Sequence, residues 1–277
     1  MSDKIYSFSE YWNEIKKISY QPSKEILLFR GHRDISWELQ PSVFRYKNEK
    51  DFERNVYHEV MIEYPEEFQN RSHLTNLVKM QHYKIPTRML DFSRNPIIGL
   101  HFACTDEGSN GNDNRDGIVF VQKVKRQDIL HHNSDRALML SCLPCLSDGR
   151  KAELKEFCKK HNGRITEQYA RDYNSAIHCF LHEIRGEYPG FECEISADDL
   201  MKGYYVAPFK DNERMKKQDG LFYIFGLDET PLKKDNNNTY KIIIDKNSKA
   251  EIMNDLELLG ASKSDLYLEP VDTSEKM

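Results

Sequence analysis

Residues 80–103 of the chain read Met-Gln-His-Tyr-Lys-Ile-Pro-Thr-Arg-Met-Leu-Asp-Phe-Ser-Arg-Asn-Pro-Ile-Ile-Gly-Leu-His-Phe-Ala. This stretch is rich in polar side chains among apolar residues typical of a core, and six of them within fifteen positions are candidate site residues: Gln81, His82, Thr87, Arg88, Asp91 and Asn95. A buried polar group without a hydrogen-bond partner costs about 1–3 kcal/mol. The stretch therefore predicts either a structural polar network or a ligand site.

The local pattern predicts how this stretch folds. Pro86 favours an extended path around it, because the residue before a proline avoids the helical region. Asn95-Pro96 is typical of an N-cap followed by proline at the first helical position, and predicts a helix through Ala103. Upstream, residues 25–29 form an apolar run that predicts a short buried strand, with Gly31 permitting a sharp chain exit.

Further segments predict a mixture of strands and helices. Strands are expected at residues 117–124, 191–195, 203–207, 220–225 and 239–244. Helices are expected at residues 1–23, at 149–185 with a break near Asn162-Gly163, and at 249–259. No repeat or long linker interrupts the chain. We therefore expect one α+β domain over residues 1–277, with a mostly antiparallel or mixed sheet, flanking helices and a helical insertion at about 125–188.

Composition limits the functional classes. A net charge of −5 and a pI near 6.1 argue against a broad electrostatic footprint for duplex nucleic acid. The N-terminus lacks the apolar core of a signal peptide, and no window approaches the ~18 apolar residues of a spanning helix. Six dispersed cysteines are typical of reduced thiols. A cytoplasmic protein without membrane association is expected.

Arg30 follows Leu27-Leu28-Phe29, which places it at the edge of a core. A planar guanidinium there suits bidentate recognition of a phosphate or carboxylate. The alternative is a structural ion pair with Asp91 or a glutamate. The sequence leaves both open.

The other polar residues also have structural readings. His82 is typical of a core histidine as well as of a site residue, and Arg88 with Asp91 could tie the turn together. Glu192-Cys-Glu194 places two carboxylates on one face of a strand. Such a pair could act as a general base, or it could belong to a solvent-exposed strand edge. For Cys142-Leu-Pro-Cys145 we favour two packed thiols over metal or redox chemistry, because a zinc site needs a second ligand pair and His131-His132 is the only nearby candidate. No Rossmann, P-loop or nucleophile-elbow motif occurs.

The motifs resemble those of the FRG domain family. The resemblance rests on Phe29-Arg30-Gly31 and on Gln81-His82-Tyr83-x-x-Pro86-Thr87-Arg88-x-Leu90-Asp91-Phe92-x-x-Asn95-Pro96, and it extends over roughly residues 24–270. Arg214-x-x-x-Gln218-x-Gly220-x-Phe222 is similar as well. Lys84 and Phe92 depart from the family pattern, which has glycine and tryptophan there. The resemblance implies an α+β domain from bacteria, with a role in defence against phage or in toxin systems.

A second resemblance, to arginine-class ADP-ribosyltransferases, suggests chemistry. These enzymes carry an aromatic-Arg-Gly strand end, then a Ser/Thr strand leading into a helix that ends in Phe-Ala, then a Glu-x-Glu strand. Here Phe29-Arg30-Gly31, the segment from Thr87 to Ala103, and Glu192-Cys-Glu194 follow in the same order. Thr87-Arg88-Met89 replaces the Ser-Thr-Ser core of that class.

This resemblance implies NAD as substrate, with no covalently bound cofactor or metal. The implied catalytic residues are Glu194, His82 and Gln218, where Gln218 is an alternative occupant of the carboxylate position. The implied binding residues are Arg30, Gly31, Gln81, Thr87, Arg88, Asp91, Asn95 and Arg214. The predicted function is a domain that binds an NAD-like nucleotide, with ADP-ribosyl transfer or NAD cleavage as its chemistry. A non-enzymatic sensor or interaction module is the alternative, and its protein or nucleic-acid partner and its oligomeric state are left open.

Overall fold

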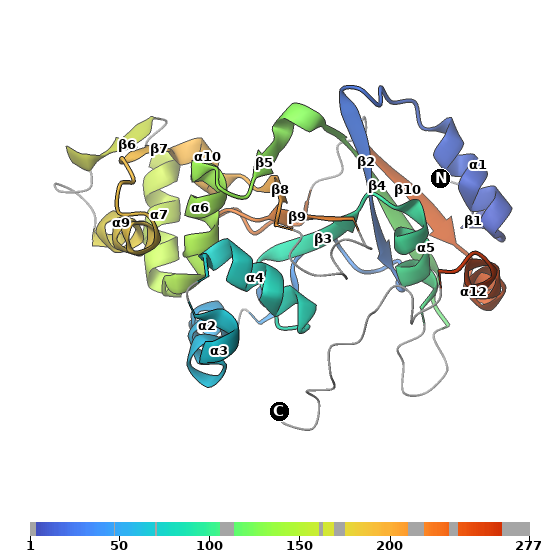
Figure 1. The fold of residues 1–277 in the computed structure, drawn as a ribbon, viewed down its shortest axis with the longest axis horizontal. Coiled ribbons are helices and arrows are strands. Elements are labelled where there is room, and N and C mark those ends of the chain that lie inside the picture. Colours follow the sequence, from blue (N-terminus) through green and yellow to red (C-terminus); the bar gives the residue numbers. More distant parts are fainter. Residues whose placement is uncertain are drawn as a thin grey trace.

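The structure is a computed structural model that describes residues 4–46, 48–69, 71–105, 114–160, 163–168, 175–209, 219–232 and 238–261. Within these ranges an eight-stranded mixed sheet is flanked by helices, which confirms the predicted α+β class (Figure 1). All six cysteines lie in these ranges and none forms a disulfide. None of the helices in the described ranges is long and apolar enough to span a bilayer.

The large sheet accounts for most of the predicted strands. Its order is β1 (Lys4–Ile5), β10 (Thr239–Ile244), β4 (Gly117–Lys125), β2 (Glu25–His32), β3 (Met89–Ser93), β9 (Gly220–Ile224), β8 (Tyr204–Ala207) and β5 (Ile129–His131). The two outermost pairings, β1–β10 and β8–β5, are parallel, and the others are antiparallel. β2 continues straight through Gly31 to His32, so the sharp exit predicted at Gly31 is wrong.

Three helices cover one side of the first half of this sheet. They are α1 (Phe8–Lys17), α5 (Pro96–Cys104) and α12 (Lys249–Leu258). Their apolar side chains share one core with residues of β2, β4 and β10, including Tyr11, Leu27 and Val119. The Asn95 side chain caps α5 by accepting a hydrogen bond from the Ile97 amide, as the Asn-Pro pattern predicts.

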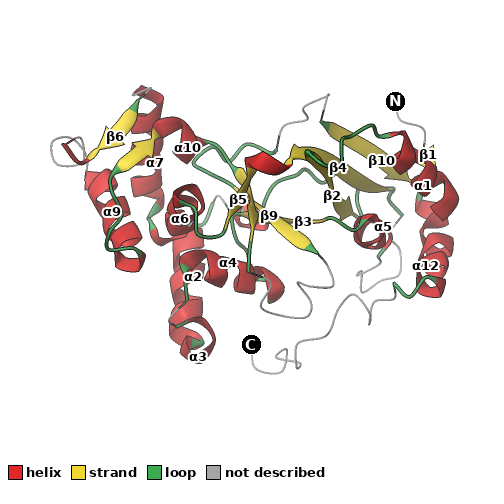
Figure 2. Ribbon diagram, turned by 45° about the horizontal axis from the view of Figure 1, so that its top comes forward, coloured by secondary structure: helices red, strands yellow, loops and turns green. Residues whose placement is uncertain are grey.

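The remaining helices gather at the other end of the molecule (Figure 2). They are α2 (Phe52–Glu63), α3 (Pro65–Phe68), α4 (His73–His82), α6 (Asp135–Cys142), α7 (Asp148–Lys160), α9 (Ser175–Glu187) and α10 (Ala197–Met201). They enclose a second core, which β9 and β8 also reach. A small sheet of β6 (Arg164–Thr166) and β7 (Glu194–Ser196) lies at the edge of this helical part. The helices of the expected 125–188 insertion thus share their core with α2 and α4.

Two glycines allow α5 to lie directly on β2. A Cβ atom at Gly31 would lie 1.9 Å from the Gly99 carbonyl oxygen and 2.6 Å from the Ala103 backbone nitrogen. A Cβ atom at Gly99 would lie 2.9 Å from the Phe29 Cβ. The glycine of the Phe29-Arg30-Gly31 run is therefore required by helix-on-strand contact.

We expect Gly31→Ala to lower the free energy of unfolding by about 3 kcal/mol or more, because both clashing groups are backbone and α5 must move. Urea denaturation followed by circular dichroism measures this loss. Gly149→Ala in α7 is the matched control, since its new Cβ would have no neighbour within 4 Å. Equal stability of the two variants would contradict the packing argument.

Candidate functional site

The large sheet separates between β2 and β3. These strands share one registered pair, Phe29 opposite Ser93, and beyond it β3 turns away from β2 (Figure 1). A cavity of about 500 Å³ opens at this junction. Its walls come from β2, the segment that follows β2, the end of α4, β3, α5 and the start of β9.

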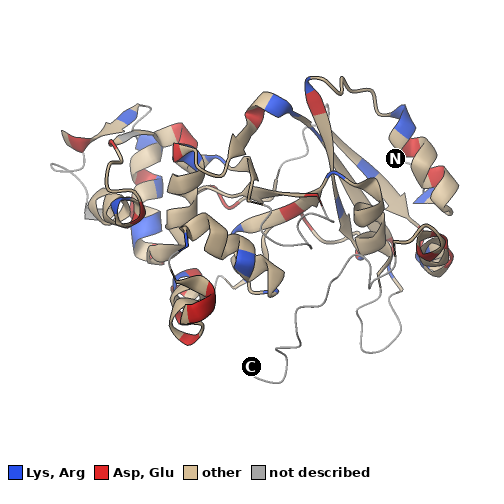
Figure 3. Ribbon diagram, in the orientation of Figure 1, with Lys and Arg blue, Asp and Glu red and all other residues tan. Residues whose placement is uncertain are grey.

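The cavity combines cationic and aromatic side chains. Its charged lining residues in the described ranges are Arg30, Arg33, Arg45, Lys84 and Asp91, and its aromatic ones are Phe29, Trp37, Phe92, Phe102 and Phe222. Four cations thus face one carboxylate, in a chain whose net charge is −5. Figure 3 shows acidic residues on α3 and α12, at two outer edges of the molecule. The positive charge of the cavity is therefore a local feature.

Arg30 bridges the gap where the strands separate. Its Nη1 donates hydrogen bonds to the Asp91 backbone oxygen at 2.8 Å and to the Asp91 carboxylate at 2.5 Å. Its Nε donates to His32 Nε2 at 3.0 Å. The structural ion pair with Asp91 therefore exists, but it lies in the cavity wall. The pair holds the guanidinium in a fixed orientation there, which lowers the entropic cost of binding an anion.

His32 acts as an uncharged support for Arg30. Because Arg30 Nε can only donate, His32 Nε2 accepts, and the ring proton lies on Nδ1, which is 3.3 Å from the Trp37 carbonyl oxygen. Burial, followed by the nearby Arg30 charge, lowers the pKa of His32 from 6.5 to about 3. The imidazole thus remains neutral and keeps its lone pair for Arg30 at physiological pH.

This shift of the His32 pKa predicts acid sensitivity. The folded-state pKa is below the unfolded one, so the unfolded chain binds more protons as the pH falls from 6.5 toward 3. We expect the His32 contribution to stability to be complete above pH 6.5 and to have fallen by about 2 kcal/mol at pH 5. Urea denaturation between pH 8 and pH 5 measures it. His32→Gln should show a flatter profile, and parallel profiles for both proteins would contradict the assignment.

Trp37, Arg33 and Arg45 were missed by sequence reasoning. The Arg33 guanidinium lies 5.2 Å from the Trp37 ring centroid, and that of Arg45 lies 5.7 Å from it. Both distances allow cation–π attraction. Arg33 and Trp37 lie in the irregular segment after β2, and Arg45 ends a short 3₁₀ helix at Ser42–Arg45, so no periodicity marks the three residues. A signal was nevertheless present, because two arginines flank the one tryptophan that follows the Phe-Arg-Gly run.

The end of α4 contributes a third wall. Gln81 and His82 both line the cavity, and Gln81 Nε2 donates to the Met89 carbonyl oxygen at 2.6 Å. Lys84 follows with a φ of 61°, in the left-handed region that glycine adopts at low cost. Glycine would therefore fit position 84 at low conformational cost. In this chain the position adds a cation to the cavity.

Three of the predicted site residues make structural contacts in the described part of the chain. Thr87 is buried and its Oγ1 accepts a hydrogen bond from the Met89 amide, while Asn95 caps α5. Arg88 is fully buried and pairs with Glu53 of α2, not with Asp91. None of the three is among the residues that line the cavity. Their role as binding residues therefore stays a prediction that the cavity lining does not support.

The predicted catalytic residues do not all meet at the cavity. Glu194 begins β7 in the small sheet, which Figures 1 and 2 place at the opposite end of the molecule from β2. Arg214 and Gln218 lie outside the described residues. His82 is thus the one predicted catalytic residue that the described part of the chain places in the cavity wall. Four predicted binding residues also line the cavity: Arg30, Gly31, Gln81 and Asp91.

The comparisons with known proteins agree with the motif reading. No curated protein and no solved structure matches the chain. Residues 25–112 match the model of the FRG domain, a range that contains β2, α4, β3 and α5. The structure gives a physical reason for each residue of the Phe29-Arg30-Gly31 run: Phe29 packs in the core, Arg30 lines the cavity and Gly31 admits α5. Residues 25–112, about a third of the chain, therefore match an FRG domain.

Proposed function

We propose that the cavity between β2 and β3 binds a nucleotide through its phosphates, and that NAD is the first candidate. The observation that carries this proposal is the lining of four cations and five aromatic rings around about 500 Å³. Ligand pockets in proteins typically measure about 300–1,000 Å³. Arginine forks match phosphate oxygens, and flat aromatic rings stack on bases.

Within this proposal, Arg30 is the main phosphate contact. Its position is fixed by Asp91 on one side and His32 on the other, so little rotamer entropy remains to be lost on binding. Arg33 and Arg45 supply further charge beside Trp37, which would stack on a base or on the nicotinamide ring. Gln81 and His82, at the end of α4, also line the cavity and would orient a ribose.

The arrangement supports binding more than turnover. Cleaving the glycosidic bond of NAD develops positive charge on the ribose, which a carboxylate stabilises. Among the described lining residues Asp91 is the one carboxylate, and Arg30 already occupies its Oδ1. We therefore favour the non-enzymatic sensor over ADP-ribosyl transfer. A domain that responds to nucleotide levels is compatible with the anti-phage role implied by the family resemblance.

A ligand panel tests this proposal. Isothermal titration calorimetry and thermal shift are measured with NAD, ADP, inorganic phosphate and uncharged adenosine, and nicotinamide release is followed in the NAD samples. We expect NAD and ADP to bind and to raise the Tm, and adenosine to do neither. No nicotinamide should be released from NAD. Absence of binding by every phosphate-bearing ligand would contradict the proposal. Steady release of nicotinamide would show that the protein cleaves NAD and would contradict the sensor proposal.

A further inference from the structure

A second cluster of reactive side chains lies in the helical part, away from the cavity. His73 is the first residue of α4, Cys142 is the last residue of α6, and Cys145 ends the short turn that follows α6. Glu183 and Glu187 lie one helical turn apart on α9. The local sequence does not indicate these partners for the Cys142-Leu-Pro-Cys145 pair. In the folded chain, His73, Glu183 and Glu187 lie beside the two cysteines.

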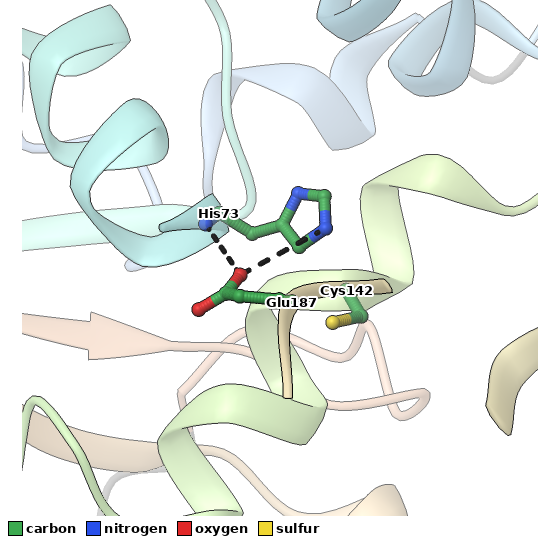
Figure 4. Close-up of side chains that lie close together, drawn as sticks. All are labelled: His73, Cys142 and Glu187. Atoms are coloured by element: carbon green, nitrogen blue, oxygen red, sulfur yellow. Dashed lines mark hydrogen bonds and ion pairs between the residues drawn. The ribbon is translucent and has the colours of Figure 1, made fainter. Parts of the chain in front are cut away.

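The donor atoms are close enough to share one ion. One ring nitrogen of His73, the Cys142 sulfur and a Glu187 carboxylate oxygen all lie within 4.8 Å of one another (Figure 4). The His73 Nε2–Glu187 Oε2 distance is 3.8 Å. In a tetrahedral zinc site, bonds of about 2.0–2.3 Å place neighbouring donor atoms roughly 3.3–3.8 Å apart. Small side-chain adjustments would therefore bring these three donors onto a common ion.

The groups around the three donors fix their orientation. The Tyr57 hydroxyl lies 2.6 Å from His73 Nδ1, which directs Nε2 toward Glu187. The Glu187 carboxylate in turn accepts a hydrogen bond from the His73 backbone amide at 2.8 Å. Metal-binding histidines usually have such a partner on their second ring nitrogen, because it sets the tautomer and the ring position.

Charge also favours a cation at this place. The Glu187 side chain is largely shielded from solvent, with 17% of its surface exposed. Within the described ranges, no lysine or arginine forms an ion pair with it, and His73 is its one ion-pair partner. A second three-residue group, His73, Cys145 and Glu183, adjoins the first, with Cys145 Sγ 3.6 Å from His73 Nδ1. The cluster thus places the carboxylates of Glu183 and Glu187 beside two cysteine thiols and one imidazole.

We propose that His73 Nε2, Cys142 Sγ and the Glu187 carboxylate bind one Zn²⁺ ion. Mixed nitrogen, sulfur and oxygen donors suit this borderline ion, whereas Mg²⁺ and Ca²⁺ prefer oxygen alone. On binding, the Cys142 S–H bond breaks, its proton passes to solvent, and the sulfur keeps the electron pair that forms the Zn–S bond. The ion ties α4 to α6 and α9, and so anchors the helix whose other end carries Gln81 and His82.

Metal analysis of the purified protein tests this proposal first. We expect about one zinc per chain in the wild type, a loss of most of it in Cys142→Ser, and full retention in Cys158→Ser. Cys158 is a matched control, because it is also a buried free thiol but belongs to neither donor group. Equal zinc content in the two serine variants would overturn the assignment to Cys142.

A second measurement keeps the test valid if Cys142→Ser does not fold. Wild-type protein is stripped with a chelator and titrated with Co²⁺, which gives a thiolate charge-transfer band in the near ultraviolet when a cysteine binds it. We expect the band to saturate at about one equivalent and to disappear when Zn²⁺ is added. A stripped, folded wild type that shows no band and takes up no Zn²⁺ would overturn the proposal.

Discussion

Replacement of Arg88 by methionine is expected to lower the free energy of unfolding by about 3–5 kcal/mol. Arg88 is fully buried, and its Nε and Nη2 donate to the two Glu53 oxygens at 2.7 and 2.6 Å. Its Nη1 donates to the carbonyl oxygens of Phe225 and Gly226. The variant therefore leaves a buried carboxylate short of its main partner and two carbonyl groups without this donor.

The charge state of Glu53 supports this magnitude. Burial would raise the pKa of Glu53, but the charges of Arg88 and Lys151 outweigh it and hold the pKa at about 2. Lys151 Nζ lies 2.7 Å from Glu53 Oε2, and the three side chains join α2 and α7 to the start of β3. The network thus links the helical part of the molecule to the large sheet.

Urea denaturation of the wild type, of Arg88→Met and of the double variant with Glu53→Gln measures the coupling. We expect the double variant to lose less than the sum of the two single changes, because no unpaired carboxylate remains. Arg30→Gln is the control for a partly exposed pair and should cost at most about 1 kcal/mol. A loss below 1 kcal/mol in Arg88→Met would contradict a structural role for Arg88.

The second large effect concerns the ligand. We expect Arg30→Gln to weaken NAD binding by about 10- to 100-fold, since a hydrogen bond to a charged group contributes about 1.5–3 kcal/mol. The melting temperature should change by only a few degrees, because the Arg30–Asp91 pair is partly exposed. Calorimetric titration with NAD and thermal denaturation of the same samples give both quantities.

Arg136→Gln is the matched control for Arg30→Gln. Arg136 also pairs with a carboxylate, that of Asp199 at 2.8 Å, but it lies on α6 and does not line the cavity. Its NAD affinity should equal that of the wild type. If Arg30→Gln lost stability and affinity together, or if Arg136→Gln lost as much affinity, Arg30 would be a structural residue rather than a phosphate contact.

The sequence predicted the local structure better than the long-range contacts. The Asn95-Pro96 pair specifies α5 through capping, and the apolar run of β10 specifies a strand, so both were predictable from neighbours in the chain. The prediction of a chain exit at Gly31 was wrong, because this glycine is needed for close contact with the backbone of Gly99 in α5. The Arg88–Glu53 pair is separated by 35 residues, and no local pattern in either segment indicates the other.

The same distinction holds for the site. Arg30, His82 and Asp91 share a cavity because β2 and β3 separate after one registered pair, and strand patterns do not encode such a separation. Glu194 follows the order expected from the transferase resemblance, yet order in the chain does not determine which sheet a strand joins. Trp37 and Arg33 lie in an irregular segment and Arg45 ends a four-residue 3₁₀ helix, and periodicity gives no information in either.

The most direct test of the proposed cavity uses its own tryptophan. The chain has two tryptophans, and Trp12 lies on α1 outside the cavity lining, so Trp12→Phe leaves Trp37 as the single reporter. Titration of this variant with NAD should quench the Trp37 fluorescence saturably, and adding Arg30→Gln should shift the midpoint to at least tenfold higher NAD. Unchanged Trp37 fluorescence at NAD concentrations that saturate the calorimetric signal would place the ligand elsewhere and contradict the account.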